Sequence, residues 1–191
     1  MHKGRMEAFS DGVIAIIITI MILELKIPEE GELAALIPLI PKFLSYIFSF
    51  VFIGIYWNNH HHLLQAAKQV NGAVLWANLN FLFWLSMVPF VTGWMGENNF
   101  STIPVAAYGV VLLLSGLAFY ILVRTLVTTH GADSVLADVL GKDKKGMYAL
   151  LIYIVAIPLS FVSAWVAVAL YVAVSIMYLV PEKRIENKLA E

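Results

Sequence analysis

Four polar side chains near the beginning of the chain have types that could do chemistry: Arg5, Glu7, Ser10 and Asp11. They flank the start of an apolar run, where ionisable groups are costly unless they are paired or wet. Arg5 and Asp11 stand about 120° out of alignment on a helix, so we do not expect them to pair with each other. We expect partners from other helices, in a buried network or at a pore mouth. The alternative is that Ser10 and Asp11 cap the helix while Arg5 reaches lipid headgroups.

Three consecutive histidines, His60, His61 and His62, invite a metal interpretation. Successive residues of a helix point about 100° apart, so the three side chains cannot converge on one ion. We therefore expect no permanent metal and no cofactor. One or two of the imidazoles should instead bond polar groups of the first helix. Other donors and acceptors at a similar depth are Asn58, Asn59, Asn78, Asn80, Trp57, Trp76 and Trp84.

The composition places these residues in a membrane protein. Of the 191 residues, 61% are hydrophobic and 13% are charged, whereas soluble domains are about 45–50% apolar and about 25% charged. The net charge of -1 and the lack of a basic run argue against a nucleic-acid partner. The chain has no cysteine and none of the sequence motifs of hydrolases or metalloproteases, so we do not expect an enzyme.

Six apolar stretches predict an all-α, polytopic membrane protein with a single domain over residues 1–191. The expected spans are 6–27, 43–64, 73–95, 103–127, 147–160 and 164–180, with a loop over 128–146. The first would be about 33 Å long, enough for a hydrocarbon core of about 30 Å. The apolar run 147–180 would be about 51 Å long as one helix, which is too long for one crossing. Pro158, Ser160 and Ser163 therefore predict a turn within it.

The basic residues predict the orientation of these spans. With six spans, ten of the 12 Lys and Arg residues fall on the side of both termini, and only Lys26 and Lys42 fall on the other side. The positive-inside rule then places both termini in the cytoplasm. Acidic residues such as Glu24 and Glu97 fall on the outer side, where they would attract cations.

One stripe of the first span has the spacing expected of a helix face: Gly12, Ile16, Thr19, Ile20 and Leu23. Acids next to both ends and apolar residues between them suit an ion path with a hydrophobic constriction. The alternative is that any apolar helix contains such a stripe. Because no internal repeat is visible, a symmetric path would have to form between subunits.

The pattern Arg5-x-x-x-Phe9-Ser10-Asp11 at the start of the first span resembles the motif of the transmembrane protein 175 family, the lysosomal and prokaryotic potassium channels. The resemblance extends to the segment Tyr56-Trp57-x-x-His60-His61, to Asn80 and Trp84, and to the six-span plan. The network hypothesis that follows comprises Arg5, Phe9, Ser10, Asp11, His60, His61, Asn80 and Trp84.

The resemblance implies a homotetramer in a prokaryotic inner membrane, with the first helix of each subunit lining a central pore. It implies a constriction at Ile16, a pore-facing hydroxyl at Thr19 and an outer ring at Leu23, with Ile20 on the same stripe. It implies leak-type conduction of potassium in preference to sodium, with the ion only in transit. The alternative is a proton-coupled transporter in which Asp11 and the histidines relay protons, although the chain lacks the clear internal repeats and broken midplane helices usual in transporters.

Overall fold

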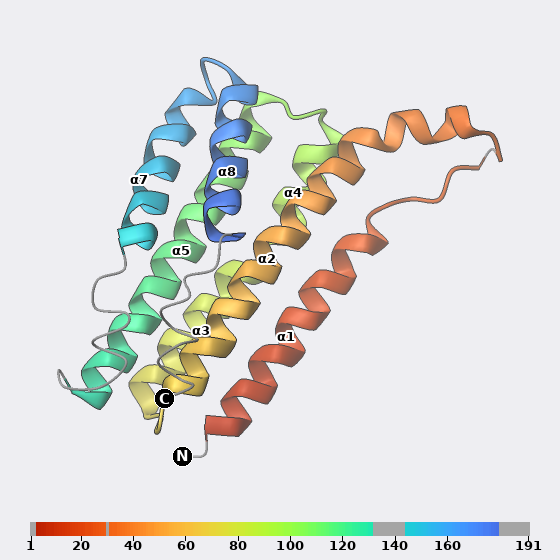
Figure 1. Cartoon of the computed structure of the whole chain (residues 1–191). Coiled ribbons are helices and arrows are strands. Elements are labelled where there is room, and N and C mark those ends of the chain that lie inside the picture. The colour runs from red at the N-terminus through yellow and green to blue at the C-terminus, as the bar shows by residue number, and fades with distance from the viewer. Residues whose placement is uncertain (1–2, 30, 132–143, 180–191) are drawn as a thin grey trace.

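The computed structural model describes residues 3–29, 31–131 and 144–179, and every regular element within these ranges is a helix. The prediction of an all-α fold is confirmed (Figure 1). The elements in chain order are α1 (Lys3–Leu23), the 3-10 helix η1 (Leu33–Leu39), α2 (Ile40–Ala66), α3 (Gly72–Ser86), α4 (Val88–Glu97), α5 (Thr102–His130), α7 (Lys144–Leu159) and α8 (Ala164–Leu179).

The six predicted spans correspond to α1, α2, the pair α3 and α4, α5, α7 and α8. Four continuous stretches are long and apolar enough to cross a membrane: 3–23, 33–66, 72–97 and 102–130. The helices α7 and α8 are apolar but shorter, at 16 residues each. The predicted turn between the last two spans is present, since α7 ends at Leu159 and α8 begins at Ala164.

The third span is broken, which the sequence interpretation did not include. The helix α3 ends at Ser86, and α4 begins at Val88 with Pro89 in its first turn. Proline has no backbone N–H and disfavours helical geometry in the residue before it, so the regular helix is interrupted here. The predicted loop 128–146 also differs, because α5 continues to His130 and α7 begins at Lys144. Residues 132–143 of that loop lie outside the described ranges.

The helices pack so that α1 lies at one edge of the bundle (Figure 1). It contacts α2, α3 and α4, whereas α5 occupies a central position against α3, α4, α7 and α8. Large buried side chains such as Phe81, Tyr108 and Leu122 fill the contacts around α5. An edge position leaves one side of α1 without a neighbour in the subunit.

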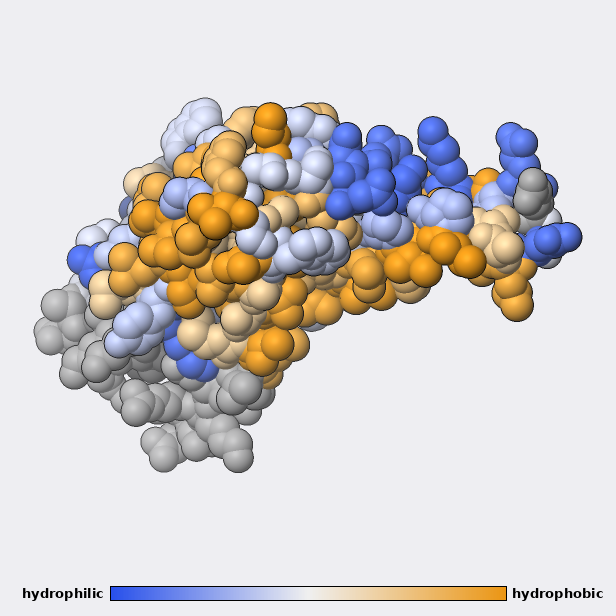
Figure 2. All heavy atoms as spheres, turned by 90° about the horizontal axis from the view of Figure 1, so that it is seen from above, coloured by the Kyte–Doolittle hydropathy of each residue, from blue (hydrophilic) through white to orange (hydrophobic). Residues whose placement is uncertain are grey.

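An arm that contains η1 projects from the end of the bundle where α1 ends and α2 begins (Figures 1 and 2). Seen from above, hydrophilic side chains gather along one edge of the arm and apolar ones along the other (Figure 2). The arm carries exposed apolar side chains, among them Leu33 at 84% and Ile37 at 64% exposure. The arm belongs to the segment 28–41, which the sequence predicts to be external.

Candidate functional site

The predicted pore stripe lies on the face of α1 that the rest of the subunit leaves open. The buried residues of this helix share the opposite side: Met6, Ser10, Ile14, Ile17 and Met21. In the stripe, Ile16 is 58% exposed, Ile20 is 43% exposed and Leu23 is 79% exposed. Gly12 and Thr19 are exposed as well. The five residues therefore form one continuous open face that several copies of the chain could share.

Thr19 carries the hydroxyl group of this open face. Its Oγ1 donates a hydrogen bond of 2.9 Å to the carbonyl oxygen of Ile16 within the same helix. Because the hydroxyl hydrogen is used inside the helix, the oxygen retains acceptor lone pairs on an exposed side chain. Such an oxygen can contact a passing cation.

Behind the stripe, a buried chain of hydrogen bonds joins α2, α3 and α1. His60 Nε2 donates to Asn78 Oδ1 at 2.8 Å, and Asn78 Nδ2 donates to Ser10 Oγ at 2.9 Å. Ser10 Oγ in turn donates to the carbonyl oxygen of Met6 at 2.8 Å. His60, Asn78 and Ser10 are almost completely buried, at 0%, 1% and 0% exposure. The chain fixes the start of α1 against the two neighbouring helices, because an unpaired polar group in this environment is costly.

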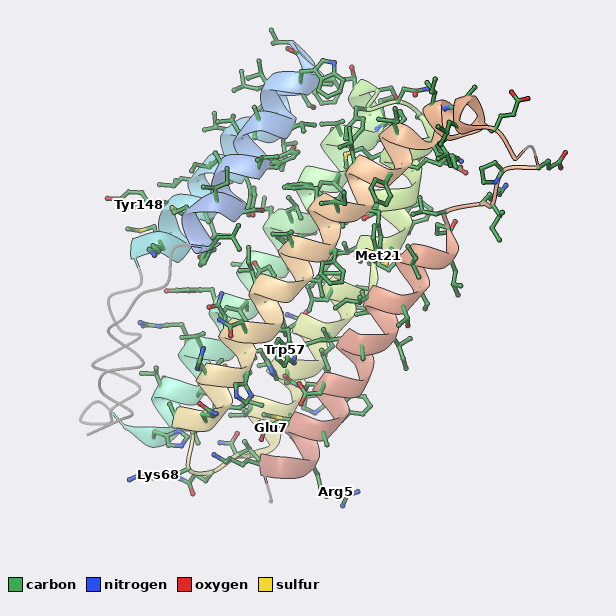
Figure 3. The ribbon with its side chains drawn as sticks, turned by 45° about the vertical axis from the view of Figure 1, so that its right-hand side comes forward. Arg5, Glu7, Met21, Trp57, Lys68 and Tyr148 are labelled. Atoms are coloured by element: carbon green, nitrogen blue, oxygen red, sulfur yellow. The ribbon has the colours of Figure 1, made fainter. Side chains whose placement is uncertain are left out.

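Two further contacts link α1 with α2 closer to the surface. Trp57 Nε1 donates a hydrogen bond of 3.0 Å to Asp11 Oδ1. Glu7 Oε1 lies 3.6 Å from His61 Nδ1, which forms an ion pair when the imidazole is protonated. Figure 3 shows Glu7 and Trp57 between the two helices, whereas Arg5 points away from the bundle. The acids at the start of α1 therefore bind α2 and do not bind Arg5.

The structure thus places only some of the predicted network residues together. Ser10, Asp11, His60 and His61 belong to the contacts described above. Asn80 is exposed, Trp84 is half-buried, and neither contacts this network in the described subunit. The reason is the register of α3, because Asn78 shares the buried face of that helix and Asn80 stands about 200° around from Asn78. Trp84 lies closer to the middle of the span than the network does.

Arg5 and Phe9 also lie outside the network within one subunit. Both are exposed, with Phe9 at 54%, and Arg5 makes no hydrogen bond or ion pair with another described residue. They share the side of α1 that carries Ile16 and Leu23, since their helical spacing aligns them with the stripe. The two motif residues therefore extend the open face toward the N-terminal end of the helix.

Asn78 and Trp57 take part in the site although the predicted network does not include them. The sequence offers both as possible hydrogen-bond donors, but it does not distinguish them from the neighbouring polar residues. A signal for Asn78 exists in the spacing of the apolar residues Val74, Phe81 and Leu85, which lie on its face of α3. Trp57 is 44% exposed, so hydrophobic periodicity alone does not place it next to Asp11.

An open groove separates α1 from α4 beside the stripe. Its walls are formed by residues from the middle of α1 onward, from the end of α3 and from α4: Val13, Ile16, Ile17, Ile20, Glu24, Ser86, Pro89, Phe90, Gly93, Trp94 and Glu97. Glu97 forms an ion pair of 3.1 Å with Lys42 at the C-terminal end of α4. Glu24 is exposed at the same end, directly after the stripe. The C-terminal end of the open face therefore carries carboxylate groups, which favour cations over anions.

The side chains of His60 and His61 lie in different surroundings. Within ranges 3–29, 31–131 and 144–179, no group of three or more His, Asp or Glu side chains lies close enough to hold a metal ion. His60 is buried against Asn78, and His61 is near the surface with Glu7 and Gln65. The side chains diverge because neighbouring residues of a helix face different directions.

Comparisons with known proteins agree with this arrangement. A family model described as "Endosomal/lysosomal potassium channel TMEM175" matches residues 5–89, which include α1 and the polar contacts behind it. A potassium channel from Chryseobacterium sp. (strain P1-3) is 49% identical to this chain over 191 residues, and the alignment covers 100% of each of the two chains. A potassium channel from Streptomyces collinus is 34% identical over 188 residues, covering 93% of this chain and 91% of the relative.

The fold has a solved counterpart as well. The crystal structure of a lysosomal potassium-selective channel TMEM175 homolog from Chamaesiphon minutus matches with a TM-score of 0.81 and 29% sequence identity. The match covers 93% of this chain and 96% of that chain. By sequence over its full length and by fold, the chain belongs to the TMEM175 family.

Proposed function

We propose that the chain is the subunit of a potassium-selective, leak-type cation channel whose pore is lined by α1. The observation that carries the proposal is the open stripe on α1, which comprises Ile16, Thr19, Ile20 and Leu23 and which no other described helix covers. The relatives that are similar over the whole length and are named potassium channels support it. The function is passive transport, without an enzymatic step or a cofactor.

The pore would form between four copies of the chain. One helix at the edge of a bundle cannot enclose a path, whereas four such edges around a common axis can. Each subunit then contributes one stripe, one set of outer carboxylates and one buried network to the pore. In this proposal residues 1–191 form a single channel domain. The hydrogen bonds of Ser10 and Asp11 hold each α1 from behind while its stripe faces the axis.

The ring of Ile16 side chains would be the narrowest part of the pore. Isoleucine offers no oxygen to replace the hydration shell of an ion, so the ring resists conduction by excluding water. Potassium holds its hydration shell less tightly than sodium, so partial dehydration at the ring costs less for potassium. Thr19 would supply the nearest hydroxyl oxygens, and Leu23 would form an outer apolar ring.

We further propose that both termini are cytoplasmic and that the chain resides in the inner membrane of a prokaryotic cell. The support is the distribution of basic residues. In this orientation Glu24 and the Lys42–Glu97 pair lie at the outer mouth, while Lys3 and Lys68 lie at the inner end.

Flux measurements on the purified full-length chain in liposomes test the function. The expected result is passive movement of potassium down its gradient, faster than that of sodium, without a requirement for a proton gradient. Potassium and sodium that move at equal rates, and only together with protons, would instead support a transporter. Native mass measurement of the same sample tests the tetramer separately.

The second candidate function is proton movement, alone or coupled to a solute. It is favoured by one observation, the buried series from His60 through Asn78 to Ser10, in which each donor points to the next acceptor. If protons follow this series, substitution of His60 by Gln should reduce acidification of proteoliposomes and leave potassium flux in place. Unchanged acidification in that variant would exclude this path.

A further inference from the structure

The turn between α2 and α3, residues 67–71, is held by a lysine from the pore helix. Lys3 Nζ donates hydrogen bonds to the carbonyl oxygens of Leu64 at 3.0 Å, Gln65 at 3.3 Å and Ala67 at 2.8 Å. Leu64 and Gln65 belong to the last turn of α2, and Ala67 follows its last residue; α2 has no basic residue in its own last turn. The C-terminal end of a helix attracts positive charge. Lys3 on α1 therefore supplies the basic side chain that the last turn of α2 lacks. The turn thereby ties the start of α1 to the end of α2.

The same turn is held on another side by the last residue of α5. His130 Nε2 accepts a hydrogen bond of 2.9 Å from the backbone N–H of Lys68 and a second of 3.3 Å from that of Gln69. The other ring nitrogen, Nδ1, lies 2.8 Å from the carbonyl oxygen of Leu126. The turn is therefore fixed between two helices that are far apart in the sequence, α1 and α5.

These partners define the protonation state of His130. A backbone N–H can only donate and a carbonyl oxygen can only accept, so Nε2 carries a lone pair and Nδ1 carries the hydrogen. The structure thus requires a neutral imidazole. A second proton would convert Nε2 into a donor that faces two donors, and both bonds to the turn would be lost.

We propose that His130 is a proton-sensitive positioning residue for the pore helix. When neutral, it holds the α2–α3 turn where the turn binds Lys3. When it is protonated from the face that carries the N-terminus, its two hydrogen bonds to the turn are lost, the bond of 3.2 Å from Asn71 Nδ2 to Thr129 Oγ1 is left between the turn and α5, and the hold on α1 weakens. The front of α1 is open in the subunit, so no described helix stops a loosened end from moving toward the proposed pore axis, where it would narrow the path. This step rests on the proposed function, because it requires α1 to line the pore.

The charged groups that the described residues bring to this end of the bundle are mostly cationic, with Glu7 as an acid between α1 and α2. The turn contributes Lys68, α1 contributes Lys3 and α5 contributes Arg124, all of them cationic. The first turn of α3 has no titratable side chain. The nearby pair of Glu7 and His61 between α1 and α2 responds in the opposite sense, because protonation of His61 strengthens its attraction to the carboxylate.

Hydrogen exchange of the full-length protein in lipid nanodiscs tests the switch itself. From about pH 8 to about pH 5.5, which spans the range in which histidine titrates, the amides of Lys68 and Gln69 should lose about tenfold of their protection after correction for the intrinsic rate. In His130→Gln they should stay protected, because the glutamine carbonyl accepts at both pH values. The comparison variant His61→Gln lacks the pair with Glu7 but keeps His130, so the two amides should still lose protection at low pH. Protection that persists at low pH, or that is lost equally in His130→Gln, would overturn the proposal.

Potassium flux tests the connection to the pore. Acid on the N-terminal face should reduce the flux of the unaltered channel by roughly two- to fivefold, a typical size for coupling between sites, and should leave His130→Gln unchanged. Lys3→Met should reproduce the low flux at about pH 8 and show no further acid response. If acid lowers the amide protection of the turn but leaves the potassium flux unchanged, the proposed connection between the turn and the pore is wrong. If the turn responds and no variant conducts potassium at any pH, the proposed function has failed and the histidine switch stands.

Discussion

The side-chain amide of Asn78 donates a hydrogen bond of 2.9 Å to Ser10 Oγ and so joins α3 directly to α1 inside the bundle. The same side chain accepts a hydrogen bond from His60 of α2. One asparagine therefore satisfies polar groups from two other helices at a place that neither water nor lipid headgroups reach. Its loss would leave both partners buried without their hydrogen bond.

Replacing Asn78 by Ala should lower the free energy of unfolding by about 1–3 kcal/mol, the usual cost of stranding a buried polar group. Asn80→Ala is the matched control on the same helix, because Asn80 is exposed. Thermal unfolding of both variants in detergent measures the difference. Equal losses in the two variants would mean that the Ser10–Asn78–His60 series does not stabilise the bundle.

Asp11→Ala should reduce the yield of assembled channel or its current, and leave the preference for potassium unchanged. The reason is that Asp11 binds Trp57 behind the open face. Trp57→Phe removes the same hydrogen bond and retains the ring, so the double variant should lose little more than either single one. A channel that assembles normally but changes its ion preference would place Asp11 in the permeation path.

Ile16→Asn should raise the conductance and reduce the preference for potassium over sodium, since a polar ring admits water at the constriction. Ile17→Asn is the control, because Ile17 is adjacent in sequence but buried at 3% exposure and should mainly harm packing. Single-channel recording in bilayers distinguishes the two. If a well-folded Ile16 variant keeps both conductance and selectivity, α1 does not present this face to the pore.

Gly109→Ala should destabilise the contact between α5 and α8. A Cβ atom at Gly109 would overlap the hydroxyl of Tyr171 and lie 2.6 Å from its Cζ, and Tyr171 is fully buried. Overpacking of this kind costs about 1–3 kcal/mol. Gly54→Ala on α2 has open space around its Cβ and should be neutral or stabilising by up to about 1 kcal/mol. Unfolding in detergent should therefore separate the two substitutions by sign.

Both termini should be accessible from the cytoplasm and the arm of η1 from outside. Protease protection of tags in sealed vesicles checks this, with a tag inserted after Glu29 as the reference for the outer face. A C-terminal tag found on the same face as that tag would contradict the six-span topology.

The number of spans could be predicted from the sequence because a helix must contain enough consecutive apolar residues to match the thickness of the hydrocarbon core. The turn after Leu159 was also predictable, since a run of that length cannot cross once. The break before Pro89 was not predicted, because both halves of the span are apolar and the break leaves the hydropathy unchanged. Within the site, the stripe follows from helical spacing, but the choice of Asn78 over Asn80 depends on how α3 is rotated in the bundle. The contacts of Lys3 and His130 are with backbone groups, which no side-chain pattern reveals.

The open face of α1 has a consequence for how the channel is made. In water, exposed side chains such as Ile16 and Leu23 would drive aggregation, but acyl chains solvate them about as well as another helix does. A newly inserted subunit can therefore persist singly in the bilayer without a chaperone to cover this face. Association then depends on close packing and on the density of subunits in the membrane, so the number of complete pores should rise more steeply than the amount of protein synthesised.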